Sequence, residues 1–161
     1  MAAKGTFSPT SAGADQVAAE LLARHNTIRQ QQRKAALTAD VRLVRAAQKH
    51  AMWMATNETL AHTGDNGTTP LQRTEHEGYF AASIGENITR GDELVVDVMK
   101  KWVGTASYSK NVLNSVFVKV GFGYARGRKF RYYCAVYASA HGARHIEVQR
   151  TLTTSGGHFS D

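Results

Sequence analysis

Apolar residues recur at helical spacing over the first third of the chain. In the range 15–33 they return every three or four positions, which predicts an amphipathic helix with Asp15 near its N-terminal cap. Asp40 is a candidate cap for a second helix that runs to about Thr56. The predicted core face of this second helix comprises Val44, Ala47, Ala51, Met54 and Ala55.

Two shorter helices are predicted beyond a polar loop. The stretch HTGDNGTTP (62–70) has the Gly, Asn and Asp content of an ordered loop, and Pro70 favours the first turn of a third helix that Gly78 can end. A fourth helix is predicted over 92–102, with acids at its start and lysines at its end. Its apolar stripe comprises Leu94, Val95, Val98, Met99 and Trp102.

The period then changes from helical to two. Alternating apolar residues over 116–124 and again over 130–136 predict two half-buried strands joined as a hairpin. Because an isolated hairpin is only marginally stable, a third strand is needed, and SIGEN (83–87) is the best remaining candidate. Helices first and an antiparallel hairpin last indicate the α+β class.

The length of 161 residues and the 42% apolar content predict one domain. We expect it to span residues 15–140, after a flexible N-terminal segment (1–14) that could include vector-derived residues and before a partly flexible C-terminal extension (141–161). No apolar run approaches the ~18 residues that a membrane span needs, and residues 1–14 lack the apolar core of a signal peptide.

The cysteine content and the charge each limit the possible functions. The single Cys134 excludes an intramolecular disulfide and a zinc site built on several thiols. The net charge of +7 is uneven: residues 98–161 hold ten Lys and Arg against two acids, whereas residues 1–97 hold ten against eleven. Since these basic residues are spread out, a solvated surface is the favoured interpretation, and attachment to an anionic polymer or membrane is the alternative.

Several phrases occur in a fixed order along the chain: LLARHNTIR (21–29), LAHTGDNG (60–67), GENI (85–88), NVL (111–113) and YYCAVYA (132–138). Together they resemble the CAP superfamily, the SCP-like domains related to cysteine-rich secretory proteins, antigen 5 and pathogenesis-related protein 1. The resemblance implies an α-β-α sandwich with a three-stranded antiparallel sheet between helical layers, and a secreted or cell-surface protein. The lack of cysteine pairs fits the shorter bacterial members.

The resemblance also implies a cleft lined by two histidines and one or two acids, which bind a divalent metal in some members. His62 matches the first histidine and Glu86 the first acid, whereas Tyr108 stands in place of the second histidine. The second acid is missing as well. Because a phenol is a poor zinc ligand at neutral pH, we expect no cofactor, with zinc bound by His62 and Glu86 as the alternative.

The chemistry of this degenerate cleft has more than one interpretation. His62 could be a general base beside Glu86, or the two could form a structural hydrogen bond. Ser107, Ser109 and Thr63 are candidate nucleophiles, but such residues are expected by chance in a Ser-rich stretch.

We therefore expect a secreted binding module rather than an enzyme, with His62, Glu86 and Tyr108 in its binding cleft. Its ligand would be a small apolar molecule, such as the lipids and sterols bound by some family members, or a protein partner. A metal-assisted or histidine-dependent hydrolase is the first alternative, and attachment to an anionic polymer or membrane surface through the basic C-terminal half is the second. We expect a monomer that does not bind nucleic acid.

Other polar residues favour structural roles. Asn87 is expected to hold a turn through side-chain hydrogen bonds, and His25 is expected to be a packing residue of the first helix. On the second helix, His50 is expected to be partly exposed and Trp53 to lie in the core. The histidines without metal-ligand spacing are His76, His141, His145 and His158.

Overall fold

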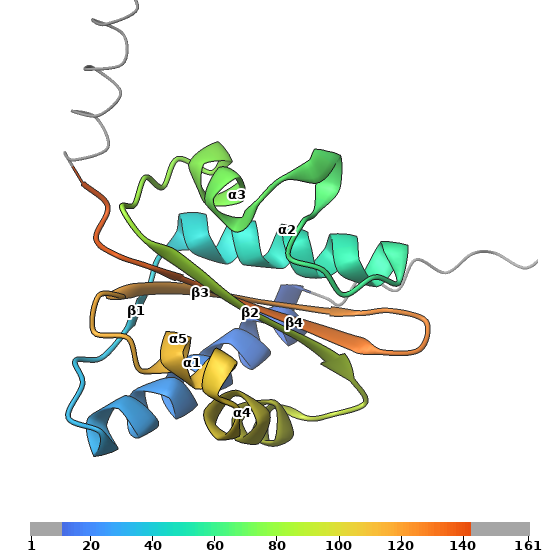
Figure 1. Ribbon diagram of the computed structural model, residues 1–161. Helices are drawn as coiled ribbons and strands as arrows, with labels where there is room; N and C mark the ends of the chain where they lie inside the picture. Colours follow the sequence, from blue (N-terminus) through green and yellow to red (C-terminus); the bar gives the residue numbers. More distant parts are fainter. Residues whose placement is uncertain (1–10, 143–161) are drawn as a thin grey trace, which may run out of the picture.

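The protein consists of three layers, a four-stranded sheet between two groups of helices (Figure 1). The structure is a computed structural model, and it describes residues 11–142. Most of the predicted N-terminal segment, nearly all of the predicted C-terminal extension, and His145 and His158 lie outside the described residues. The layered arrangement confirms the α+β class and the α-β-α sandwich.

The helices lie close to the predicted ranges. They are α1 (Ser11–Gln31), α2 (Val41–Asn57), α3 (Pro70–His76), α4 (Val95–Gly104) and α5 (Ala106–Val112), with a short 3₁₀ turn η1 (Asp65–Gly67) in the predicted loop. Asp40 is confirmed as the cap of α2, because its side chain accepts a hydrogen bond from the backbone N–H of Arg42. No helix within residues 11–142 is both long and apolar enough to cross a membrane.

Two predicted helix starts are wrong. Helix α1 begins at Ser11, so Asp15 lies inside the helix and does not cap it. Helix α4 begins at Val95, three residues later than expected. The carboxylate of Asp97 accepts a hydrogen bond from the backbone N–H of Leu94 at 3.3 Å, so Asp97, and not an earlier acid, satisfies the N-terminal end of the helix. The short helix α5 was not predicted.

The sheet contains β1 (Thr38–Ala39), β2 (Ile84–Gly91), β3 (Lys119–Arg126) and β4 (Arg131–Ala138), in the order β1-β3-β4-β2. Strands β3, β4 and β2 pair antiparallel, as expected from the hairpin and the SIGEN segment. The two-residue strand β1 adds a fourth strand, parallel to β3. In the antiparallel register Glu86 of β2 lies opposite Val136 of β4.

Helices cover both faces of the sheet, which explains why β4 is buried on both sides and is not half-buried as predicted. Helix α2 lies on one face, and α1, α4 and α5 lie on the other (Figure 1). We call the apolar cluster between the sheet and helices α1 and α4 the lower core; it includes Leu21, Val98, Trp102, Phe122 and Tyr137. We call the cluster between the sheet and helix α2 the upper core; it includes Leu43, Ala47, Met54, Ile88 and Cys134.

Two glycines of β3 bring α2 close to the sheet. A Cβ atom on Gly121 would lie 2.1 Å from the carbonyl carbon of Leu43, and one on Gly123 would lie 2.3 Å from the carbonyl oxygen of Ala47. A larger residue at either position would meet the backbone of α2, which cannot rotate out of the way. The two glycines therefore determine how closely α2 packs against the sheet. They also determine how close to the sheet the inward-facing side chains of α2 lie.

A buried arginine attaches α5 to α1. Arg29 is 1% exposed, and its guanidinium donates hydrogen bonds to the carbonyl oxygens of Val112 at 2.8 Å and Asn114 at 3.2 Å. The last carbonyls of a helix lack partners inside that helix, so this cation is well placed at the end of α5.

Candidate functional site

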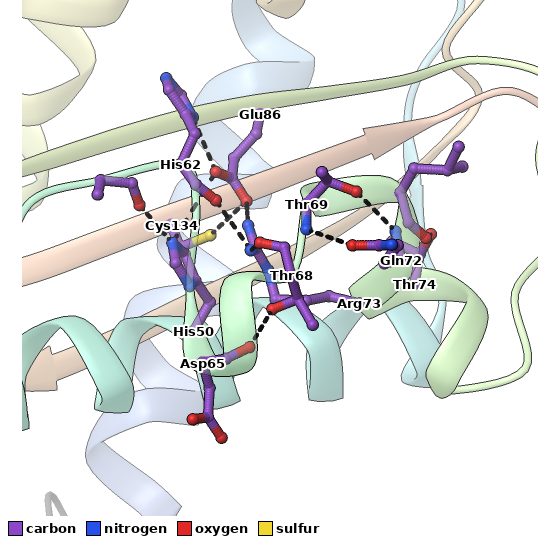
Figure 2. Close-up of polar contacts among 12 residues, drawn as sticks. His50, His62, Asp65, Thr68, Thr69, Gln72, Arg73, Thr74, Glu86 and Cys134 are labelled. Carbon is purple, nitrogen blue, oxygen red and sulfur yellow. Dashed lines mark hydrogen bonds and ion pairs between the residues drawn. The ribbon is translucent and has the colours of Figure 1, made fainter.

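Glu86 is a buried carboxylate at the centre of a polar cluster (Figure 2). It lies on the edge strand β2, and only 2% of its side chain is exposed. Its Oε1 accepts a hydrogen bond from Nδ1 of His62 at 2.8 Å, and its Oε2 accepts one from Nη2 of Arg73 at 2.6 Å. The thiol of Cys134 lies 3.7 Å from Oε2. Both oxygens therefore already have a nitrogen donor.

The structure brings His62 and Glu86 together, although His62 itself lies at the surface. The imidazole is 60% exposed, and its Nδ1–H points at the carboxylate. The hydrogen bond to Glu86 raises the pKa of His62, and partial burial and the positive charge of Arg73 oppose this effect. Nε2 is the nitrogen that remains for contacts outside the cluster.

Arg73 connects the loop before α3 to the sheet. Besides its ion pair with Glu86, its Nη1 donates to the backbone oxygens of His62 and Thr68, each at 2.8 Å. Helix α3 presents this side chain from a fixed start, because Thr69 and Gln72 form a reciprocal capping box ahead of it. Arg73 had no role predicted from the sequence, since a single arginine in a seven-residue helix is usually solvated.

His50 is buried, so the expectation of partial exposure is wrong. The residue is 1% exposed because it lies three positions after Ala47 and four before Met54, on the core face of α2. This spacing could have revealed its burial. Its Nε2–H donates to the carbonyl oxygen of Ala61 at 2.7 Å and lies 4.0 Å from Oε1 of Glu86. Burial lowers the pKa of His50, which the negative charge of Glu86 offsets only in part.

Trp53 lies beside His50 and is half-buried, not a full core residue as expected. The two rings are nearly parallel, with an interplanar angle of 10° and centroids 5.8 Å apart. The indole and the buried imidazole are therefore stacked in parallel planes.

Tyr108 lies on α5, where its half-buried side chain packs against the lower core. Glu86 lies beside Arg73 and Cys134, on the side of the sheet that faces α2 and α3. The contact of Tyr108 with this region runs through Asn87, whose Nδ2 donates to the backbone oxygen of Tyr108 at 3.1 Å. The role of Tyr108 in a shared cleft stays a prediction.

Asn87 is fully buried and joins β2 to α5, so its hydrogen bonds span elements and do not hold a local turn. It donates to the hydroxyl of Tyr137 at 3.2 Å and accepts from Asn111 at 2.8 Å. The candidate nucleophiles lie apart from this network: Ser107 and Thr63 are exposed, and Ser109 donates to the carbonyl oxygen of Ala106.

A pocket of 340 Å³ lies next to this cluster, between α2 and the segment that contains η1 and α3. We call it the α2–α3 pocket. It is lined by Ala46, Lys49, His50, Trp53, Asp65, Asn66, Thr68, Arg73, His76 and Glu77. Arg73 and His50 belong both to the pocket wall and to the surroundings of Glu86, so the two features share a wall. Among residues 11–142, no group of three or more His, Cys, Asp and Glu side chains is arranged to hold a metal ion.

Comparisons with known proteins agree with this architecture. The model of the cysteine-rich secretory protein family (CAP) matches residues 22–138. The uncharacterized protein YkwD of Bacillus subtilis is 28% identical over 99 residues, which are 62% of this chain and 38% of YkwD.

Two solved structures share the fold. An extracellular SCP-domain protein of Bacillus anthracis superposes with a TM-score of 0.72 and 22% identity, covering 84% of this chain and 45% of that protein. An outer surface protein of Borrelia burgdorferi superposes with a TM-score of 0.68 and 21% identity, covering 75% of this chain and 90% of that protein. The chain thus spans less than half the length of YkwD and of the B. anthracis protein.

Proposed function

This chain belongs to the cysteine-rich secretory protein (CAP) family, and on that premise we propose that it is a secreted or cell-surface domain that binds a small ligand without catalysing a reaction. The proposed location is supported by the extracellular and outer-surface descriptions of the two similar structures. The proposed ligand site is the α2–α3 pocket.

The non-catalytic part of the proposal rests on one observation: Nη2 of Arg73 forms an ion pair with Oε2 of Glu86 at 2.6 Å. The negative charge that a metal ligand would supply is already paired with the guanidinium of Arg73, and both oxygens accept hydrogen bonds from nitrogen donors. In this arrangement Glu86 fixes His62 and Arg73 in place.

The donor set around Glu86 does not fit a resident zinc ion. The guanidinium of Arg73 adds a positive charge where a cation would have to approach, and the family resemblance aligns Tyr108, whose phenol is a poor zinc ligand, with the second histidine. Burial raises the pKa of the Cys134 thiol well above its ordinary value, so the thiolate that zinc prefers is disfavoured. The proposed function therefore requires no metal ion.

The first test has a metal arm and a turnover arm. Titration with zinc chloride in a calorimeter should give no saturable heat at micromolar protein, and zinc should leave the melting temperature unchanged, since a ligand selective for the native state must stabilise it. Panels of ester and peptide substrates should give equal background rates for the native protein and for Glu86→Gln. Zinc binding that Glu86→Gln abolishes, or turnover that it abolishes, would overturn the proposal.

The second test asks whether the pocket binds ligands at all. A chemically mixed fragment library, followed by the backbone amide signals in NMR, should shift residues around Asn66 and Thr68 in the pocket wall. Fatty acids and sterols belong in the library as probes of the apolar ligand expected from the family resemblance. If no compound shifts these signals, the binding role is wrong.

A second candidate function is attachment to an anionic surface. It is favoured by the end of the β3–β4 hairpin, where Arg126, Arg128 and Lys129 are exposed and Arg90 of the neighbouring strand lies over the ring of Phe130. Binding through this cluster should fall steeply as the salt concentration rises from about 50 to about 200 mM. Salt-insensitive binding to anionic vesicles or heparin would contradict it.

A further inference from the structure

Two buried polar atoms at the α2–α3 pocket have no hydrogen-bond partner within the described part of the chain: Nδ1 of His50 and Nε of Arg73. Buried polar groups normally have partners, so an unpaired pair in a pocket wall points to a group supplied from outside. The two side chains meet beside Gly64, because a Cβ atom there would lie 2.7 Å from Nδ1 of His50 and 3.1 Å from Nη1 of Arg73.

The two unpaired atoms require opposite partners. His50 uses its Nε2–H as the donor to the carbonyl oxygen of Ala61, so in the neutral ring Nδ1 carries no proton and can only accept. Nε of Arg73 always carries a proton and can only donate. A hydroxyl group both donates and accepts, so hydroxyl groups match the needs of both atoms.

The wall next to this pair is flat and aromatic. Trp53 is half-buried, and its ring is stacked parallel to the imidazole of His50. An indole face attracts a ligand with an apolar face of similar size, such as the C–H face of a saturated six-membered ring. Trp53 and Ala46 are the apolar side chains in the lining, which gives little surface for an acyl chain.

Both Lys and Arg side chains of the lining are paired with carboxylates, and Asp65 adds a further carboxylate to the lining. Lys49 is paired with Glu77, and Arg73 is paired with Glu86. A phosphate or sulfate would need a free cation, and both of these cations are already neutralised by carboxylates. Asp65, Asn66 and Thr68 add further hydrogen-bonding groups to the lining of the pocket. The chemistry therefore favours an uncharged ligand rich in hydroxyl groups.

We propose that the α2–α3 pocket binds one uncharged pyranose ring of a saccharide, with the ring face against Trp53 and its hydroxyl groups toward His50 and Arg73. The volume of 340 Å³ lies at the lower end of ligand pockets and suits a single ring. Lys49, Asp65, Asn66 and His76 are exposed, so the ring can also be one unit of a longer chain. This inference rests on the proposed binding role of the domain.

The test is an NMR titration of the ¹⁵N-labelled protein with glucose, mannose, galactose, N-acetylglucosamine and its trimer. At least one neutral sugar should shift the indole signal of Trp53 and the amides of Asn66 and Thr68 in a saturable way. The dissociation constant should be on the order of 1 mM for a monosaccharide, because a small neutral ligand makes few contacts. Tighter binding of the trimer would assign the ring to a polymer, and equal binding would assign it to a free sugar.

Substitutions connect binding to the proposed contacts. Trp53→Leu keeps an apolar side chain but removes the aromatic face, and it should weaken sugar binding by about tenfold or more. Met52→Leu is the matched control, since Met52 is 43% exposed on the same helix and does not line the pocket; it should leave affinity unchanged. Sugar binding that survives Trp53→Leu undiminished would overturn the inference.

Two further probes separate this inference from the proposed function. Octanoate and glucose 6-phosphate should shift the pocket amides less than the best neutral sugar does. If no sugar shifts the pocket amides while other fragments shift them, the saccharide inference is wrong and the proposed binding role is retained. If neither sugars nor fragments shift them, both proposals fail.

Discussion

Nη2 of Arg73 lies 2.6 Å from Oε2 of Glu86, and both side chains are shielded from water, with 9% and 2% of their surfaces exposed. The ion pair joins α3 to the edge strand β2. Because the same guanidinium donates to the backbone oxygens of His62 and Thr68, the position of the loop between α2 and α3 depends on it as well.

Replacing Arg73 should strongly destabilise the protein. Arg73→Leu leaves the carboxylate of Glu86 buried without its cation, so we expect the free energy of unfolding to fall by about 3–5 kcal/mol. Urea denaturation followed by circular dichroism measures this change. Arg45→Leu is the control: Arg45 is an exposed arginine of α2, and its replacement should change stability by about 0.5 kcal/mol or less.

The double variant Arg73→Leu/Glu86→Leu shows whether the loss comes from the unpaired charge. Replacing both members by apolar residues removes the buried charge altogether, so the double variant should be more stable than the sum of the single changes predicts. Additive losses would contradict direct coupling between the two residues.

His62 should make stability depend on pH near neutrality. Since the hydrogen bond to Glu86 raises its pKa, the folded protein holds the proton more tightly than the unfolded chain does. This stabilisation is complete below the unfolded pKa of about 6.5 and is lost as pH rises through the higher folded pKa. His62→Ala should therefore cost more stability at about pH 5 than at about pH 9, by under about 1 kcal/mol because the ring is exposed to solvent.

An NMR titration of the imidazole signals tests the same point directly. The pKa of His62 should lie above its ordinary value in the native protein and should fall in Glu86→Gln, which removes the negative charge. A His62 pKa that is unchanged in Glu86→Gln would show that another group causes the shift.

The elements of the fold could be predicted because their signals are local. Asp40 caps α2 through its own side chain, and Pro70 and Gly78 delimit α3 in sequence. Strand β1 could not be predicted, since its two residues owe their conformation to pairing with Lys119 and Val120 far along the chain. Helix α5 is equally dependent on context, because a buried arginine from α1 donates a hydrogen bond to the carbonyl oxygen of its last residue, Val112.

The polar cluster around Glu86 could be predicted only in part from the sequence. His62 and Glu86 could be paired through the family resemblance, since their phrases keep a fixed order. Arg73 could not be assigned, because burial of its charge depends on how α3 packs against β2, and a pattern of residue types does not contain that distance. The burial of His50 could have been predicted from its helical spacing, but the residue is polar and polar residues are usually exposed.

A buried histidine on α1 should make the protein sensitive to acid. Nδ1–H of His25 donates to the carbonyl oxygen of Leu21 and Nε2 accepts from the hydroxyl of Tyr137, each at 2.7 Å, so the folded protein holds the neutral ring. Burial is the main cause that lowers the pKa of His25 to about 4. The unfolded chain takes up a proton below about pH 6.5, so stability should fall as pH drops from about 6.5 to about 4, by roughly 3 kcal/mol.

Urea denaturation at several pH values measures this loss, and His25→Phe should reduce its slope. Because Phe keeps a ring between Trp102 and Phe122 but cannot be protonated, the variant can be less stable overall and still lose less stability in acid. The neighbouring effect of His50, whose pKa is also lowered, remains in this variant and sets the residual slope. An unchanged slope in His25→Phe would show that other groups cause the acid sensitivity.

Gly123→Ala should separate α2 from the sheet and disturb the α2–α3 pocket. The new Cβ would lie 2.3 Å from the backbone oxygen of Ala47, so α2 has to move, at a cost of about 1–3 kcal/mol or more. The amide signals of the loop that contains Ala61 should shift, because His50 moves with α2 and donates to the carbonyl oxygen of Ala61. Gly104→Ala is the control: nothing lies within 4 Å of the added Cβ, so stability should be unchanged or rise by up to about 1 kcal/mol. If both variants melt at the native temperature, β3 and α2 do not pack in close contact.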